Sequence, residues 1–190
     1  MMRGNLRWLL GALLLLLGTM SRAATYHDTV ELFRNAGQSG TFFKTCYGYA
    51  LFPTIGKGGL VVGAAHGDGR VYAQGKYIGD ISMTQVSVGL QAGGQAYSQI
   101  IFFEDKRAFE EFTNGSFEFG ADASAVAITA AAEASAGTTG VNSGASGGMK
   151  DAVTAGRYYR GFAVFTIVKG GAMYQATLAG QKYTYTPKEP

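Results

Sequence analysis

The side chains that most often do covalent or metal chemistry are scarce in this 190-residue chain, which has two histidines, His27 and His66, and one cysteine, Cys46. Their spacing matches no metal-binding pattern. A Ser-His-Asp arrangement could be assembled on paper from His66, Asp68 and one of several serines, but the chain has no G-x-S-x-G motif. We interpret Cys46 as a small buried hydrophobe on a helix face. The residues therefore predict no catalytic site, no metal site, no cofactor and no enzymatic activity.

A glycine-rich stretch from Tyr47 to Tyr72, YGYALFPTIGKGGLVVGAAHGDGRVY, raises the question of a phosphate-binding loop around Lys57. A P-loop requires G-x-x-x-x-G-K-[ST], whereas Gly58 follows Lys57 here. A dinucleotide-binding loop follows a strand and opens a helix, whereas this segment follows a predicted helix and opens a predicted strand. We interpret its glycines as structural, and only Lys57 keeps a ligand-binding role.

The elements that must position these residues are mostly strands. Glycine is abundant at 29 residues while proline is rare at 3, which favours a folded β-rich domain with tight turns. Helices are predicted at residues 25–37 and 39–52, the second ending before Pro53. A third is predicted at residues 104–114, with Phe109 and Phe112 facing inward and its acidic pairs in solvent.

Predicted strands occupy most of the remaining chain. They cover residues 59–65, 70–78, 81–93, 96–103 and 117–136, a pair of strands within residues 161–180, and residues 181–187. Turns are expected at residues 66–69 (HGDG), 78–80 and 169–171, and residues 137–156 form a tract of flexible composition. The fold class that follows is α+β: a single domain dominated by an antiparallel, strongly curved β-sheet with a few short helices.

The N-terminus has the pattern of a secretory signal peptide at residues 1–23. Arg3 and Arg7 precede an apolar run from Trp8 to Met20, and small residues stand at the expected cleavage site. The run is shorter than the roughly 20 apolar residues that a membrane span needs. No cysteine is placed for lipid attachment, so we expect an exported protein of the periplasm or outer envelope that is not a lipoprotein.

Charge gives no reason to expect nucleic-acid binding. The formal net charge of +3 includes Arg3, Arg7 and Arg22, and the remaining 13 Lys and Arg residues equal the 13 Asp and Glu residues. The domain predicted at residues 24–190 is therefore formally neutral, whereas nucleic-acid-binding domains usually carry a basic face.

Four sequence blocks, taken in order, resemble the SYLF-domain family of lipid-binding and actin-regulating domains. They are YGYALFPTIGKGGLVVGAA, MTQVSVGLQAGGQAYSQIIFFEDKRAFEEF, FEFGADASAVA and YYRGFAVFTIVKGGAMYQA. The resemblance runs from about Tyr47 to Tyr185 and is nearest to the bacterial secreted members. It implies a β-rich domain without catalysis whose eukaryotic relatives associate with phosphoinositide membranes and actin. For an exported protein, we expect no actin partner and a bacterial envelope phospholipid as the ligand.

The resemblance and the basic residues near predicted turns and strand ends together favour binding of anionic membrane lipid. Each lysine or arginine near such a surface contributes about 1 kcal/mol of attraction. The candidate lipid-binding residues are Lys57, Arg70, Lys76, Arg157, Arg160 and Lys169. The alternative is a structural or protein-interaction module of the envelope, either monomeric or oligomeric, in which the alternating alanines from Ala121 to Ala127 allow close sheet packing between or within subunits.

Overall fold

The computed structural model describes residues 25–36, 39–59, 62–88, 93–119, 127–128, 158–171 and 180–189. It begins with a helix over residues 25–35 and the short helix α2 (Ser39–Phe42). Four long strands follow: β1 (Gly48–Gly59), β2 (Val62–Ala73), β3 (Lys76–Val88) and β4 (Gly93–Phe103). Then come α3 (Lys106–Thr113), β5 (Ser116–Glu118), β6 (Ala127–Ile128), β7 (Phe162–Gly171) and β8 (Gln181–Pro187).

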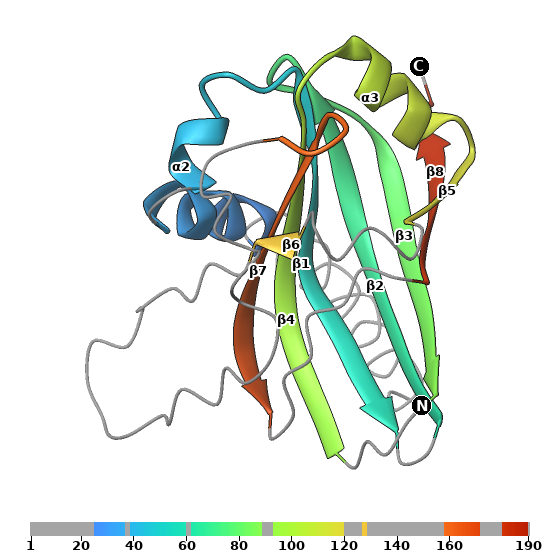
Figure 1. Cartoon of the computed structure of the whole chain (residues 1–190). Coiled ribbons are helices and arrows are strands. Elements are labelled where there is room, and N and C mark those ends of the chain that lie inside the picture. The colour runs from blue at the N-terminus through green and yellow to red at the C-terminus, as the bar shows by residue number, and fades with distance from the viewer. Residues whose placement is uncertain are drawn as a thin grey trace, which may run out of the picture.

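All eight strands belong to one open sheet with the order β5-β8-β3-β2-β1-β4-β7-β6. Every neighbouring pair is antiparallel except β6 and β7. Figure 1 shows the first two helices beside one face of the sheet and α3 across one end. The predicted α+β class with a dominant antiparallel sheet is therefore confirmed.

The sheet is strongly curved, as the sequence predicted. Phe117 lies on β5, at one end of the strand order, and Phe162 lies on β7, near the other end. Their ring centroids are nevertheless only 5.3 Å apart. The sheet must therefore curl so that strands far apart in its order meet across a shared interior.

The sheet separates two hydrophobic clusters. The concave inner face packs Phe52, Phe103 and Phe162 against Phe112 of α3. The outer face packs Leu51, Phe102 and Phe165 against Phe33 of the first helix and Phe42 of α2. Within the described part of the chain, no helix combines the length and hydropathy needed to span a bilayer.

Two predicted helices are confirmed, and one is wrong over most of its length. The first helix runs over residues 25–35, and α3 begins after Asp105, whose carboxylate accepts a hydrogen bond from the Ala108 N–H at 2.8 Å. The helix predicted over residues 39–52 ends at Phe42, because β1 already begins at Gly48 and continues through Pro53. Pro53 is tolerated in this interior strand because the register of β1 shifts there, a β-bulge.

The three predicted turns within the strand region are also wrong. Residues 66–69 lie inside β2, residues 78–80 lie inside β3, and residues 169–171 lie at the end of β7. The actual β2–β3 turn is at Gln74 and Gly75, both with positive φ. The single strand predicted at 117–136 is also wrong, because its described parts belong to two strands, β5 and β6, at opposite ends of the sheet order, and Phe119 follows β5 outside any strand. Residues 120–126 and 129–136 and the tract at 137–156 lie outside the described residues.

Close approach of two strands explains why glycines occupy the interior of β2 instead of forming a turn. A Cβ on Gly67 would lie 2.6 Å from Ile55 Cγ1 and 2.9 Å from the Thr54 carbonyl oxygen. A Cβ on Gly69 would lie 2.7 Å from the Phe52 ring. The bulge in β1 brings these atoms inward, so β2 passes them only where it has no side chain.

Candidate functional site: a buried lysine beside interior glutamines

One row of the sheet carries a group of polar residues into the interior. Lys57 on β1 pairs with Gln95 on β4 and with Ala65 on β2. Ala65 pairs with Gln85 on β3, which pairs with Gln181 on β8. Directly paired residues share a face of the sheet and have Cβ atoms ~4.5–5.5 Å apart. All four polar side chains of this row are buried.

Part of this polar interior forms a hydrogen-bonded chain, which we call the glutamine network: Gln85, Gln99, Gln181 and Tyr183. Gln99 Nε2 donates to Gln181 Oε1 at 3.3 Å, and Gln181 Nε2 donates to Gln85 Oε1 at 3.4 Å. The Tyr183 hydroxyl also donates to Gln181 Oε1. Burial raises the pKa of Tyr183 well above its ordinary value, so its hydroxyl keeps the proton that it donates. The network therefore links β3, β4 and β8 across the curve of the sheet.

Beside the network are two donors without an acceptor, Lys57 Nζ and Gln95 Nε2, which we call the donor pair. Lys57 is 5% exposed and Gln95 is 6% exposed. Neither nitrogen has a hydrogen-bond partner in the described structure. A buried donor without a partner costs ~1–3 kcal/mol, and a charged one costs more. The donor pair is thus the feature of the interior that most needs an added acceptor.

The electrostatics of the donor pair favour an anion as that acceptor. Removal from water lowers the pKa of Lys57, because burial disfavours the charged ammonium. Among the described residues, the buried polar set contains no aspartate or glutamate to balance this charge. A carboxylate or phosphate oxygen beside Lys57 would favour the charged ammonium and also accept from Gln95.

The other predicted basic residues do not gather around Lys57. Arg70 lies on the outer face of β2, and Lys169 is exposed near the end of β7, where its Nζ donates to Thr54 Oγ1 at 3.2 Å. Desolvation lowers the pKa of Lys169. Lys76 and Arg160 are exposed at the opposite end of the sheet from Lys57. Arg157 lies outside the described residues.

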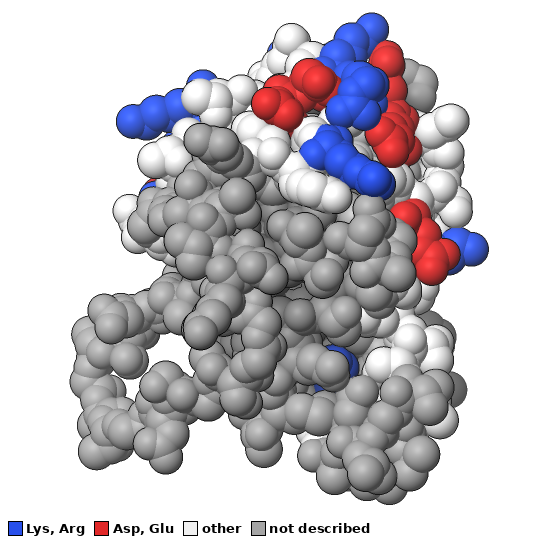
Figure 2. Space-filling model, viewed as in Figure 1, with Lys and Arg blue, Asp and Glu red and all other residues white. Residues whose placement is uncertain are grey.

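Charges of both signs are mixed at the end of the molecule that carries α3. Figure 2 shows blue and red atoms side by side there. They include two ion pairs along the helix, Lys106–Glu110 at 3.1 Å and Arg107–Glu111 at 2.9 Å. This end is therefore unsuited to a purely electrostatic contact with an anionic surface.

The residues considered for catalysis lie at two places in the fold, with His66 and Asp68 on β2 and Cys46 in the segment after α2. His66 Nε2 lies 3.7 Å from Asp68 Oδ1, and both side chains are largely exposed on β2. Cys46 follows α2 instead of lying on a helix face, and it packs half-buried against the outer-face cluster. Burial raises the pKa of its thiol, which disfavours the nucleophilic thiolate. No three potential metal ligands come together in the described residues.

Sequence reasoning identified Lys57 but missed Gln85, Gln95, Gln99, Gln181 and Tyr183. Their signal in the sequence is polar residues at alternating positions, as in Gln95, Tyr97 and Gln99. That period places them on one face of a strand, but only the register shows that the faces of different strands meet.

Comparison with known proteins gives two matches. Residues 84–187 match the family described as "Ysc84: Las17-binding protein actin regulator". The chain is also 28% identical over 163 residues to the Beta cell expansion factor A of Aeromonas veronii, covering 84% of this chain and 54% of that protein. The chain therefore spans about half the length of this relative. No solved structure gives a significant match.

Proposed function

The chain belongs to the Ysc84 (SYLF) family, and from that premise we propose that it binds anionic phospholipid without catalysing a reaction. The family includes lipid-binding and actin-binding members and is not known as an enzyme family. Of these two functions, lipid binding is the one that the donor pair supports. The phosphate oxygens of a phospholipid would supply the hydrogen-bond acceptors that Lys57 Nζ and Gln95 Nε2 lack.

The observation that carries the proposal is the buried, unpartnered Lys57. A lysine kept away from water is costly unless it is paired, and the glycine-rich strand around it could accommodate an apolar side chain at lower cost. A phosphate placed over the row would accept from Lys57 Nζ and Gln95 Nε2 together.

We further propose that the protein acts outside the cytoplasm, in the periplasm or outer envelope. The support is the signal-peptide pattern of residues 1–23. N-terminal sequencing of protein recovered from a periplasmic or envelope fraction should begin at Ala24. Recovery of a chain that still begins at Met1, from the cytoplasm alone, would contradict this location.

Vesicle co-sedimentation tests the lipid-binding proposal. The purified protein should sediment with phosphatidylglycerol vesicles and remain in solution with phosphatidylcholine vesicles. Lys57→Met removes the ammonium while keeping an unbranched apolar side chain, and it should weaken binding at least ~10-fold, the equivalent of one charge-assisted hydrogen bond. Lys76→Met is the matched control, since it removes the same charge from the exposed start of β3, at the opposite end of the sheet from Lys57, and should leave binding within about twofold.

Three results would contradict the proposal: equal sedimentation with both vesicle types, binding to neither type, or undiminished binding by a folded Lys57→Met variant. Light scattering on the same samples addresses the alternative function. A monodisperse oligomer that binds neither vesicle would instead favour a structural or protein-interaction module.

A further inference from the structure

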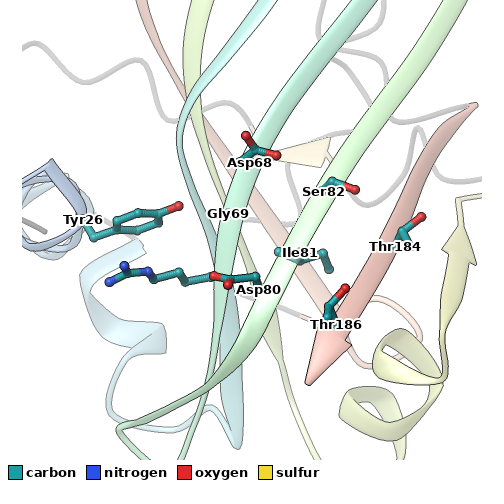
Figure 3. A pocket seen from close by; sticks show the side chains of 9 residues that line it. Tyr26, Asp68, Gly69, Asp80, Ile81, Ser82, Thr184 and Thr186 are labelled. Atoms are coloured by element: carbon teal, nitrogen blue, oxygen red, sulfur yellow. The ribbon is translucent and has the colours of Figure 1, made fainter. Parts of the chain in front are cut away.

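A cleft of about 520 Å³ lies on the outer face of the sheet, on the opposite side from Lys57. Figure 3 shows Tyr26 of the first helix facing the strands that carry Asp80, Ser82 and Thr184. The cleft is lined by Tyr26, Asp68, Gly69, Arg70, Asp80, Ile81, Ser82, Thr184 and Thr186. Its volume lies within the ~300–1,000 Å³ of typical small-molecule sites.

The register arranges the polar lining residues in two adjacent rows. In one row, Arg70 of β2 pairs with Asp80 of β3, which pairs with Thr186 of β8. In the other, Asp68 pairs with Ser82, which pairs with Thr184. Neighbours within a row have Cβ atoms ~4.5–5.5 Å apart, and the rows are two residues, about 7 Å, apart. The floor of the cleft is thus a grid of closely spaced polar side chains.

Two aromatic rings hold the guanidinium of Arg70 in place. The Arg70 guanidinium carbon lies 4.3 Å from the ring centroid of Tyr26 and 5.0 Å from that of Tyr77. Burial raises the pKa of Tyr77, and its hydrogen bond with Asp80 raises it further. Stacking of this kind restricts the guanidinium and so fixes its direction. Arg70 and Asp80 therefore present a fixed donor beside a fixed acceptor.

The charges of the cleft do not favour an anion. Asp80 is paired with Arg70 across the strands, and the remaining carboxylate, Asp68, lies near His66. A phosphate or carboxylate placed on the floor would meet two carboxylates and one guanidinium. The lining therefore suits an uncharged polar ligand, and the site is separate from the lipid site proposed above.

We propose that this cleft binds a saccharide of the size of a mono- or disaccharide. Sugar hydroxyls both donate and accept hydrogen bonds, and the grid offers carboxylate acceptors, a guanidinium donor and three hydroxyls that do both. Tyr26 also lines the cleft, where its ring stacks on the Arg70 guanidinium and holds that donor toward the sugar.

Nuclear magnetic resonance titration of the ¹⁵N-labelled protein with maltose, cellobiose and diacetylchitobiose tests the proposal. At least one disaccharide should cause saturable shifts of the backbone amides of Tyr26, Ser82 and Thr184. Thr184→Val removes one hydroxyl from the cleft and should weaken binding about two- to tenfold, as expected for one hydrogen bond.

Thr84→Val is the matched control, because Thr84 is exposed on the same face of β3 but is not part of the lining. It should leave the affinity unchanged. The absence of saturable shifts from all three sugars, with the spectrum still that of a folded protein, would overturn the proposal. Equal weakening of sugar binding by Thr84→Val and Thr184→Val would also overturn it. So would the same shifts of the cleft amides when lysine amide is added in place of the sugars.

Discussion

At the scale of the single residue, Lys57 makes folding depend on pH in a direction opposite to that of an ion-paired lysine. Its folded pKa lies below the ordinary value of 10.5 because burial disfavours the ammonium. At any pH between the folded pKa of Lys57 and 10.5, the unfolded chain binds more protons than the folded chain. The free energy of unfolding therefore rises with pH across this window, and the destabilisation is fully present below the folded pKa.

We predict that Lys57→Met raises the free energy of unfolding at pH 7 by about 1–4 kcal/mol, as when buried charged groups are replaced by apolar side chains. The advantage over the wild type should shrink as the pH rises toward 10.5. Urea denaturation of both proteins at pH 7 and pH 10.5 measures this difference. A constant difference, or a variant less stable than the wild type at pH 7, would refute the prediction.

At the scale of the element, β2 shows where sequence reasoning succeeds and where it fails. Helix α3 was predictable because its signals are local: a capping Asp105 and the inward spacing of Phe109 and Phe112. The glycines of β2 were misread as a turn because their cause lies on another strand, in the bulge of β1. The residues of the candidate functional site differ in the same way. Lys57 stood out in its own segment, whereas its neighbours Gln85, Gln95 and Gln181 come together only through register.

The contact between β2 and the β1 bulge gives a matched pair of substitutions. Gly67→Ala places a Cβ against Ile55 and the Thr54 carbonyl, and should lower the free energy of unfolding by about 1–3 kcal/mol through overpacking. Gly56→Ala adds the same methyl group on β1 where nothing lies within 4 Å, so its effect should be near zero or slightly stabilising. Thermal denaturation of the two variants, followed by circular dichroism, compares them; equal effects would disprove the close-approach explanation.

At the scale of the whole molecule, the curl of the sheet depends on aromatic contacts between strands far apart in its order. Phe162 of β7 contacts Phe117 at 5.3 Å and Phe119 at 5.7 Å between ring centroids. Phe119 follows β5 and also packs against Tyr183 of β8. The edge strands β5 and β6 are not hydrogen-bonded to each other. The curl of the sheet near Phe162 is therefore maintained by the packing of these rings.

We predict that Phe162→Ala costs about 3–5 kcal/mol of unfolding free energy, as for other large buried aromatic truncations. Amide hydrogen exchange should increase most in β5, which loses one of the aromatic rings that Phe117 packs against, and least in the central strands β1 and β2. Mass-spectrometric hydrogen exchange on the wild type and the variant tests this distribution. A uniform increase over all strands would show that the contact contributes to overall stability without specifically closing the sheet.

The strand order has a further consequence for how the chain acquires its structure. Strands β1 to β4 form a continuous block, and each outer edge of that block is covered by a strand from near the C-terminus: β8 on β3 and β7 on β4. Until the last quarter of the chain has been made, both edges expose unpaired backbone groups that can pair with other chains. The newly made protein should therefore depend on rapid completion, or on a chaperone, during the interval before its two final strands arrive.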